Sequence, residues 1–450
     1  MSMKRDIMRI LADWNVWWEK NEVPLNLLGQ KRGISDELID LMELKEIKII
    51  TGVRRSGKST ILYQIIEHLL NTGVPSKNIL LLNFEDAALA HYSPEEIYES
   101  YLSELNPSFD NFVFIDEVQR KEGWENWIRK KYDLKHATNF FVTGSSASLL
   151  KKEYATLLTG RNISEEIFPM SFREFLDFSG IHVDNTEIIS TETRSKVLFS
   201  LKKYLGWGGF PEVFFTNENY KRRLLNQYFE DIIYKDIVNR YGTNSVKTKE
   251  IGVYLLTNIA NSLSMRNVRN ALGFGLETIS DYMSYMVEAY LLYAVPIYSP
   301  SLKIQSANPK KIYCIDTGLR NAVSFKFSDD IGRLAENAVF VELKRHKQEV
   351  YYWKKNIGEV DFIVKEGLQP VEAIQVCWNL DYERTKKREI RAICSAMKDL
   401  DLERGIIITE DTQAVEETDE KQIYFIPMWK WFLNQKEQEI YKNEHPVDAS

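Results

Sequence analysis

The sequence predicts an α/β protein whose first large domain is built on a parallel β-sheet. From Glu46 onward, apolar strand patterns alternate with helix patterns, the order that a parallel sheet with covering helices requires. The strand candidates are nearly unbroken apolar runs, which is typical of strands covered on both faces. A glycine-rich turn joins the first strand to a helix, and such turns bind phosphate groups at the helix N-terminus.

Length and composition limit the classes to which the chain can belong. Its 450 residues, 44% of them hydrophobic and 12% aromatic, predict a folded protein of roughly two to four domains. No apolar run approaches the roughly eighteen residues of a membrane span, and no signal-peptide pattern opens the chain, so we expect no membrane partner. Cys314, Cys377 and Cys394 lack the spacing of a metal site, which favours a reduced, cytoplasmic setting.

The net charge of −7 belongs to the end of the chain. Residues 401–450 hold 12 acidic and 5 basic side chains, whereas the other 400 residues carry 53 of each sign. The acidity therefore argues neither for nor against a nucleic-acid partner elsewhere. Residues 434–450 are expected to form a disordered acidic tail.

The first 45 residues predict an N-terminal helical arm. Residues 4–22 place Trp14, Trp17 and Trp18 close to helical spacing with aliphatic side chains. We expect the tryptophans to dock the arm on the next domain, and a surface for a partner is the alternative.

Residues 46–180 carry the alternating pattern of the first large domain. Strands are predicted at Ile47–Thr51, Ile79–Asn83, Asn111–Ile115 and Asn139–Thr143, and helices at Ile61–Leu70 and Pro94–Leu105.

The first strand runs into a phosphate-binding loop. Residues 52–59, GVRRSGKS, fit G-x-x-x-x-G-K-[ST] without a mismatch. Lys58 would reach the β- and γ-phosphates of ATP, and Ser59 would ligate Mg²⁺. The residues expected to contact the nucleotide are Gly52, Val53, Arg54, Arg55, Ser56, Gly57, Lys58, Ser59 and Thr60.

The third strand ends in two carboxylates, Asp116 and Glu117, and looks like a Walker B motif. Hydrolysis needs this division of labour: Asp116 would hold the Mg²⁺ shell and Glu117 would orient or activate the attacking water. An acidic cap at the end of a strand is the alternative.

Three further residues are catalytic candidates. Thr143 and Ser145 end the next strand and could contact the γ-phosphate or the water, although a simple Gly-Ser turn is the alternative. Arg161 follows in TLLTGRN and could act as a sensor or arginine finger in cis or in trans, or be a plain surface arginine.

A strand between the Walker A and Walker B strands, with Glu117 after Asp116, matches the additional-strand P-loop ATPases. Together with GVRRSGKST, FIDEVQ, VTGSSASLL and TGR, the run Phe168–Phe175 resembles archaeal and bacterial AAA-like ATPases whose C-terminal part is a domain of unknown function. That family is often grouped with the AAA+ and STAND ATPases. Further family-like blocks are Tyr204–Glu212, Tyr228–Ile237 and Ile315–Leu319. The resemblance implies ATP hydrolysis with Mg²⁺ and suggests a homo-oligomer.

Residues 180–195 are a polar linker candidate, and residues 195–300 predict a helical, winged-helix-like domain. Helices are expected at Leu224–Val238, Glu250–Ser262, Val268–Leu272 and Glu277–Leu292. Four basic and four acidic side chains lie between residues 244 and 292, and the candidate recognition helix lacks Arg and Lys. Phosphate neutralisation dominates DNA affinity, so DNA contact and a structural or protein-docking role both stay open.

Residues 301–433 resemble a PD-(D/E)xK restriction-endonuclease-like core. Glu336 lies in a predicted helix, Asp361 lies in a predicted strand, and both match that family's metal-binding positions. The third position departs, because Gln375 and Cys377 stand where E-x-K is expected. Gln is a poor Mg²⁺ ligand and Cys cannot replace the lysine, so we expect a degenerate core that binds a partner or nucleic acid without nuclease activity.

A basic cluster borders this core and is interleaved with aromatic residues. It comprises Lys344, Arg345, His346, Lys347, Lys354 and Lys355, with Tyr351, Tyr352 and Trp353. Such a set suits a nucleic-acid backbone with base stacking, and a solvated helix end beside a buried strand is the alternative.

These patterns favour a Mg²⁺-dependent ATPase that couples hydrolysis to conformational change on a macromolecular partner, with DNA as one candidate. A nucleotide-gated, STAND-like signalling or binding module with little turnover is the alternative, and an ATP-driven nuclease is a weaker one.

Overall fold

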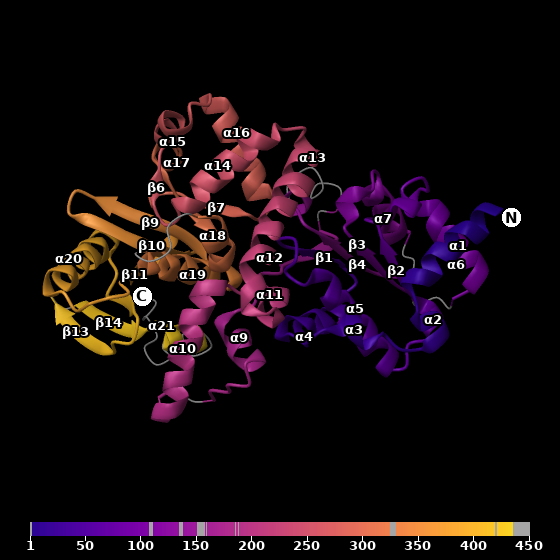
Figure 1. The fold of residues 1–450 in the computed structure, drawn as a ribbon, viewed down its shortest axis with the longest axis horizontal. Coiled ribbons are helices and arrows are strands. Elements are labelled where there is room, and N and C mark those ends of the chain that lie inside the picture. Colours follow the sequence, from indigo (N-terminus) through magenta and orange to yellow (C-terminus); the bar gives the residue numbers. More distant parts are fainter. Residues whose placement is uncertain are drawn as a thin grey trace. The chain divides into compact units, whose positions relative to one another are not determined.

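The computed structural model describes residues 2–107, 111–134, 138–150, 158, 160–184, 186–187, 189–324, 330–418 and 421–434 (Figure 1). The chain forms two compact units, described separately below. The first comprises Met1–Phe168 with Glu288–Tyr290, and the second comprises Pro169–Val287 with Leu291–Ser450. The domain boundary predicted at residue 180 lies inside the second unit. The predicted acidic tail lies outside the described residues after Asn434.

The first unit contains a five-stranded sheet in the order β2-β3-β4-β1-β5, and all neighbouring strands are parallel. The strands are β1 (Ile47–Thr51), β2 (Ile79–Asn83), β3 (Asn111–Asp116), β4 (Thr138–Gly144) and β5 (Asn162–Glu166). Strand β4 lies between the strands that carry the two nucleotide motifs. The predicted additional-strand α/β fold is confirmed. Strand β5 was not predicted, because NISEE is not an apolar run.

Alternate residues of the strands supply two separate cores, one on each face of the sheet. One core contains Ile49, Val113 and Val142 and packs against α1, α6 and α7. The other contains Ile50, Phe114 and Phe141 and packs against α5 (Figure 1). The helices are α1 (Ser2–Trp14), α5 (Lys58–Asn71), α6 (Pro94–Leu105) and α7 (Trp124–Asp133).

The N-terminal arm covers the exposed edge of β2. The helix predicted over residues 4–22 divides into α1 and α2 (Trp17–Lys20), because the Asn15 side chain pairs with the β2 backbone. Its Nδ2 donates to the Leu81 carbonyl at 2.9 Å, and its Oδ1 accepts from the Leu81 N–H at 2.6 Å. The indole N–H groups of Trp17 and Trp18 both donate to the Ile79 carbonyl. The predicted docking of the arm is confirmed. Two short helices, α3 (Leu25–Leu28) and α4 (Gly33–Asp40), follow.

The second unit begins with helices and a small sheet. The helices are α9 (Phe172–Phe178), α10 (Thr191–Trp207), α11 (Pro211–Phe215), α12 (Glu218–Asp231), a π-helix (Ile232–Val238), α13 (Asn239–Tyr241), α14 (Ser245–Thr257), α15 (Met265–Leu272), α16 (Leu276–Glu288), α17 (Leu302–Ala307) and α18 (Thr317–Val323). The antiparallel sheet has the order β6-β8-β7, with β6 (Ser262–Leu263), β7 (Leu292–Val295) and β8 (Lys310–Cys314). The helix predicted to reach Leu292 ends at Glu288.

The rest of the second unit is a six-stranded mixed sheet in the order β13-β14-β12-β11-β10-β9. Its elements are α19 (Ile331–Arg345), β9 (Glu349–Lys355), β10 (Gly358–Glu366), β11 (Gln369–Val376), α20 (Glu383–Leu400), β12 (Arg404–Thr409), β13 (Ala414–Thr418), β14 (Lys421–Pro427) and α21 (Met428–Leu433). Ala392, Ile393 and Met397 of α20 pack on one face of this sheet. No helix in the described ranges is long and apolar enough to cross a bilayer.

The basic and aromatic cluster predicted for nucleic acid does not have the geometry of a stacking surface. Tyr352 and Trp353 are buried, with exposed fractions of 1% and 2%. Lys354 pairs with Glu359 at 2.7 Å, and Arg345 pairs with Glu342 at 3.0 Å. The alternative of a buried strand holds for these two rings: they are neighbours in β9, point to opposite faces of the sheet, and are both buried, so neither is available to stack on a base.

Candidate nucleotide-binding site

The loop between β1 and α5 has the backbone that a phosphate-binding loop requires. Gly52 has a φ of 140°, and a Cβ there would lie 2.2 Å from the Ile167 carbonyl oxygen, so the position requires glycine. Gly57 has a φ of 100° and precedes the first residue of α5. The helix therefore begins directly at the loop, and its N-terminal N–H groups and dipole favour an anion there.

Lys58 is the first residue of α5 and folds back over the loop. Its Nζ donates to the carbonyls of Gly52 and Val53 at 2.9 and 3.0 Å, and the side chain is buried. The ammonium is therefore held within the loop, where a bound triphosphate would meet it.

Ser59 and Asp116 meet across the gap between α5 and the end of β3. The Ser59 hydroxyl donates to Asp116 Oδ2 at 2.7 Å, and the Thr143 hydroxyl donates to Asp116 Oδ1. Burial and the neighbouring Glu117 raise the pKa of Asp116. A divalent cation would reverse that rise, because its charge stabilises the ionised carboxylate.

Glu117 follows β3 with a left-handed φ of 55°, which turns its side chain toward the end of β4. Its Oε2 accepts hydrogen bonds from Gln119 Nε2 at 2.5 Å and from the Ser145 hydroxyl at 3.1 Å. Gln119 Nε2 also donates to the Ser145 hydroxyl at 3.0 Å. The Glu117 backbone N–H donates to the Thr143 hydroxyl at 3.1 Å. Both predicted sensor residues therefore lie beside the two carboxylates.

Gln119 and Arg32 were missed by the sequence analysis. Gln119 lies inside the quoted FIDEVQ run, and its two-residue spacing from Glu117 was the available signal. Arg32 carried no signal, because it lies in a polar stretch of the arm. Its Nη1 donates to the Ser56 carbonyl at 2.9 Å and to the Phe168 carbonyl at 3.1 Å. It thus links the phosphate loop to Phe168, the residue at which the chain leaves the first unit for the second.

The remaining loop residues divide between buried and exposed positions. Arg54 is buried, donates to Glu85 at 2.8 Å and lies 3.9 Å from Glu117 Oε2. Arg55 has a φ of 72° and is exposed, and Thr60 is partly exposed. The Ser56 hydroxyl is buried without a hydrogen-bond partner among the described residues.

Arg161 lies at the opposite end of the strands from the phosphate loop. It precedes β5, whose Asn162 pairs in register with Ile47 at the start of β1, and it forms an ion pair with Asp133 at 2.8 Å. The phosphate loop follows the end of β1, about 16 Å away along a five-residue strand. Within one chain, the parallel register therefore places Arg161 away from the phosphate loop, and a role as sensor or arginine finger stays a prediction.

The residues of this site fit ATP and Mg²⁺. An orphaned Ser56 hydroxyl, a helix N-terminus and a loop-bound ammonium suit a polyphosphate. Mg²⁺ is commonly held by one or two carboxylates together with substrate phosphates, and the Ser59–Asp116 pair supplies such a donor set. With the described residues placed as they are, no group of three or more His, Cys, Asp or Glu side chains is arranged to hold a metal ion.

Comparison with known proteins agrees with this geometry. Residues 44–176 match a family described as an AAA domain, and residues 198–330 and 331–431 match two domains of unknown function, DUF8612 and DUF4143. An uncharacterized protein of Methanocaldococcus jannaschii, MJ1544, is 35% identical over 405 residues, which cover 86% of this chain and 88% of the relative. The chain belongs to the family of MJ1544. In this chain the match to the AAA domain is limited to residues 44–176.

Two further similar proteins extend the comparison. An uncharacterized protein of Haemophilus influenzae is 33% identical over 344 residues, which cover 74% of this chain and 82% of the relative. Among solved structures, the Walker-type ATPase PABY2304 of Pyrococcus abyssi matches with a TM-score of 0.44 and 12% identity, covering 67% of this chain and 97% of its own. The AAA match of this chain includes the loop, Asp116 and Glu117.

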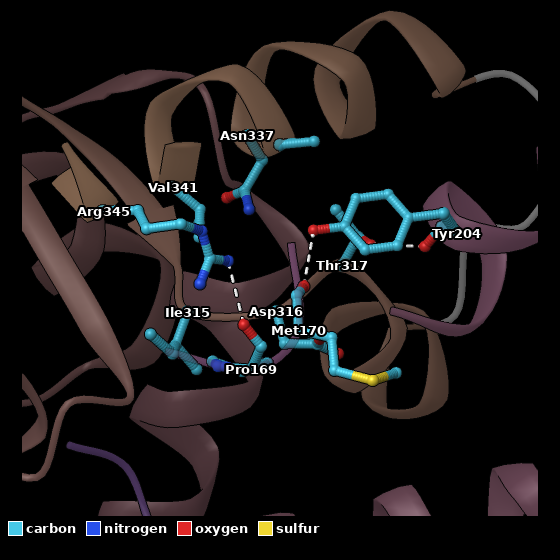
Figure 2. Close-up of a pocket in the computed structure, with 10 residues that line it drawn as sticks. Pro169, Met170, Tyr204, Ile315, Asp316, Thr317, Asn337, Val341 and Arg345 are labelled. Carbon is cyan, nitrogen blue, oxygen red and sulfur yellow. Dashed lines mark hydrogen bonds between the residues drawn. The ribbon is translucent and has the colours of Figure 1, made fainter. Parts of the chain in front are cut away.

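Figure 2 shows how the second unit holds its first two residues. Arg345 Nη2 donates to the Pro169 carbonyl at 2.9 Å, and the Tyr204 hydroxyl donates to the Met170 carbonyl at 3.0 Å. The Met170 N–H donates to the Gly209 carbonyl at 2.7 Å. The cavity at this point measures about 10 Å³, which holds no more than one water.

Two of the family-like blocks, 204–212 and 315–319, contact each other beside Pro169 and Met170. Asp316 Oδ2 accepts from the Gly209 N–H at 2.7 Å, and its Oδ1 accepts from the Leu319 N–H at 2.8 Å. Burial raises the pKa of Asp316 to about 6, although these backbone hydrogen bonds oppose the rise. These blocks therefore hold the chain in place at Pro169 and Met170, and they do not form a ligand pocket here.

The C-terminal candidates are only partly brought together. Asp361 and Gln375 are adjacent, because the Asp361 N–H donates to Gln375 Oε1 at 3.1 Å. The Cys377 thiol turns to the Asn379 carbonyl, and burial raises its pKa to about 12. Glu336 and Asp361 are joined by Lys311, a residue that the sequence analysis did not identify.

Proposed function

We propose that this protein is a Mg²⁺-dependent ATPase that couples hydrolysis to a conformational change acting on a macromolecular partner. The observation that carries the proposal is the arrangement of Glu117 beside the Ser59–Asp116 pair at the N-terminus of α5. A binding site for nucleotide alone needs the loop and the lysine. Hydrolysis needs in addition a carboxylate that is free of the metal and can act on water, and Glu117 fills that role.

Each residue has a separate task in the proposed reaction. Lys58 and the loop N–H groups bind the β- and γ-phosphates and offset the charge of the transition state. Ser59 and Asp116 would hold Mg²⁺, which would supply positive charge to the phosphate oxygens. Glu117 orients the attacking water and accepts its proton, while Gln119 and Ser145 hold the carboxylate.

A continuous set of contacts supports coupling of the site to the second unit. Arg32 links the phosphate loop at Ser56 to Phe168, and the Ile167 N–H donates to the Thr51 carbonyl at 2.7 Å. The chain then continues to Pro169, whose carbonyl is held by Arg345 within the second unit (Figure 2). A movement of the loop on hydrolysis would therefore be transmitted through residues 167–170.

The central test measures binding and turnover separately. Phosphate release and the binding of a fluorescent ATP analogue are measured for the wild type, Lys58→Ala and Glu117→Gln. We expect Lys58→Ala to lose binding, and Glu117→Gln to bind normally while turnover falls about 100-fold. Lys45→Ala, an exposed lysine just before β1, is the control and should match the wild type. Equal rates for all four proteins would remove the ATPase hypothesis.

A nucleotide-gated, STAND-like module is the second candidate. The observation that favours it is the engagement of Glu117 Oε2 by Gln119 and Ser145, with Arg54 at 3.9 Å. A carboxylate held in this way must be released before it can act on water. Tightly retained ATP with turnover slower than nucleotide exchange would favour this candidate over the ATPase.

The partner is proposed to be a protein, with DNA as the alternative. The order α14-β6-α15-α16-β7-α17-β8 supports a winged-helix-like domain, but α16 carries no Arg or Lys. Low positive charge predicts weak binding to phosphate backbones. Turnover is measured with DNA, with RNA and without either at two salt concentrations. Salt-sensitive stimulation by DNA would overturn the protein assignment.

Two further features belong to the proposal. The order α19-β9-β10-β11-α20-β12 supports a restriction-endonuclease-like core without nuclease activity, since Cys377 stands in place of the lysine.

A homo-oligomer in which Arg161 acts on a neighbouring copy would make turnover depend on protein concentration. Arg161→Ala would then abolish that dependence.

A further inference from the structure

A buried lysine of the small sheet lies among three carboxylates of the C-terminal region. Lys311 lies on β8, and its side chain is only 1% exposed. Its Nζ lies 3.0 Å from Glu336 Oε1 on α19, 2.8 Å from Asp361 Oδ1 and 2.8 Å from Glu359 Oε1, both on β10. We call Lys311, Glu336, Glu359 and Asp361 the Lys311 cluster.

The backbone of β10 aims Asp361 into this cluster. Opposite Tyr352 of β9, two residues of β10 stand where regular pairing would place one, because Val360 pairs with Trp353 and Ile363 with Tyr351. Such a bulge redirects a side chain that would otherwise alternate regularly. Val360 and Ile363 both enter the core under α20, and Asp361 is left to face Lys311.

The ammonium group of Lys311 is fully engaged by the cluster. It has three N–H donors, and three carboxylate oxygens accept from it. Neighbouring groups donate further hydrogen bonds to the carboxylates. The Tyr313 hydroxyl donates to Glu336 Oε1 at 2.7 Å, and the Val376 N–H donates to Asp361 Oδ2 at 3.0 Å. Lys354 pairs with Glu359 at 2.7 Å.

The charges of the cluster require a buried cation. Carboxylates taken out of water are stable only when a cation or strong donors face them. Burial alone would lower the pKa of Lys311, but Asp361 and Glu336 outweigh burial and hold it well above its ordinary value. Burial and Asp361 raise the pKa of Glu336 to about 7. The three carboxylate oxygens within 3.0 Å of Nζ therefore favour the charged ammonium.

We propose that Lys311 is the resident cation of this cluster, and that its ammonium occupies the space between Glu336 and Asp361 that a divalent metal would otherwise take. The C-terminal region then needs no metal and has no metal-dependent hydrolytic chemistry. The cluster also joins two family segments, because Lys311 belongs to the DUF8612 match and its carboxylate partners belong to the DUF4143 match. Lys311 thereby fixes the small sheet to the larger one. This role is independent of the proposed ATPase.

The test removes the Lys311 ammonium by mutation and then supplies Mn²⁺ as a replacement cation. Thermal unfolding of the nucleotide-free full chain is followed with EDTA and with Mn²⁺ for the wild type and Lys311→Met. We expect Lys311→Met to be destabilised in EDTA and to regain about 5 °C or more with Mn²⁺, because the metal takes the vacated position. The wild type should show no comparable shift, since Lys311 excludes the metal.

Two further variants make the result specific to the cluster. Lys430→Met removes another largely buried lysine of the second unit, which pairs with Glu187 at 2.9 Å, and should gain nothing from Mn²⁺. Adding Asp361→Asn to Lys311→Met should abolish the rescue. A Lys311→Met protein that folds normally but is not rescued by Mn²⁺ would overturn the proposal.

A second measurement that keeps Lys311 in place covers the case in which Lys311→Met fails to fold. Bound Mn²⁺ is counted by electron paramagnetic resonance for the wild type and Asp361→Asn, both free of nucleotide. Equal counts are expected, because Asp361 holds no metal while Lys311 is present. A lower count for Asp361→Asn, or plasmid cleavage by the wild type with Mn²⁺ that Asp361→Asn loses, would overturn the proposal.

Discussion

Glu117 shows how a single residue can be placed by its backbone. The left-handed turn directly after β3 separates its side chain from that of Asp116, so one carboxylate contacts Ser59 and the other contacts Gln119 and Ser145. Two adjacent carboxylates in an ordinary strand would point to opposite faces. The turn instead keeps both at the same edge of the sheet, with different partners and different tasks.

Gln119→Leu should lower turnover by about tenfold or more while leaving ATP affinity unchanged. The substitution removes the donor at 2.5 Å from Glu117 Oε2, and a hydrogen bond to a charged group contributes about 1.5–3 kcal/mol. Phosphate release and analogue binding measure the two effects separately. Gln369→Leu, an exposed glutamine at the start of β11, should change neither. A parallel loss of affinity would mean that Gln119 shapes the loop and does not position Glu117.

At the scale of the elements, the N-terminal arm covers an edge strand of the first sheet. An uncovered edge strand exposes unpaired backbone groups and invites pairing with other chains. Strand β2 lies at such an edge, and Asn15 imitates a neighbouring strand by pairing with both backbone groups of Leu81. The two indole N–H groups at Ile79 extend the cover. The arm is therefore an integral part of the first unit.

Asn15→Ala should loosen β2 locally. It leaves the N–H and the carbonyl of Leu81 without their partners, at a cost of about 3 kcal/mol, so exchange through local opening should rise about 100-fold. Hydrogen–deuterium exchange of peptides covering residues 79–83 measures the change. Peptides from β12 in the second unit and the variant Asn26→Ala, at an exposed position of α3, are the controls. Unchanged exchange at β2 would show that the tryptophans hold the arm without Asn15.

At the scale of the whole molecule, the chain passes from the first unit to the second after Phe168, and returns to the first unit for Glu288–Tyr290. Within the second unit, the Lys311 cluster connects regions that match separate families. Its buried carboxylates make the stability of this unit depend on pH in a way that an apolar contact would not.

Glu336→Gln should change that dependence with a defined sign. The folded pKa of Glu336 is about 7 against an ordinary value of 4.5, so the folded state binds the proton more tightly. The resulting stability is present below the ordinary pKa and is lost as pH rises toward about 7. The melting temperature of Glu336→Gln minus that of the wild type should therefore increase between about pH 5 and about pH 8.

Glu349→Gln is the control for this pH series. Hydrogen bonds from Tyr351 and Lys365 lower the pKa of Glu349, so its contribution is present above its ordinary pKa and is lost only in acid. Its difference from the wild type should stay nearly constant over the same pH range. A constant difference for Glu336→Gln as well would contradict the raised pKa.

The local elements of the first unit were predictable because their signals are local. Strands β1 to β4 are short apolar runs, and the loop at Gly52–Thr60 is a contiguous motif whose backbone requirements are visible in its glycines. The additional-strand α/β fold was predicted from these signals and is confirmed. Strand β5 escaped because its residues are polar, and its place in the sheet comes from pairing with β1.

The sequence by itself determined the nucleotide motif, the order of strands and helices in the first unit, and the loss of E-x-K at Gln375 and Cys377. Only the tertiary structure decided that Arg32 reaches the phosphate loop, that Arg161 lies at the other end of the strands from that loop, and that Lys311 joins Glu336 to Asp361. The physical reason is range. Periodicity and short motifs report contacts between near neighbours, whereas these ion pairs and hydrogen bonds join residues 24 to 136 positions apart, whose meeting depends on how whole strands are registered.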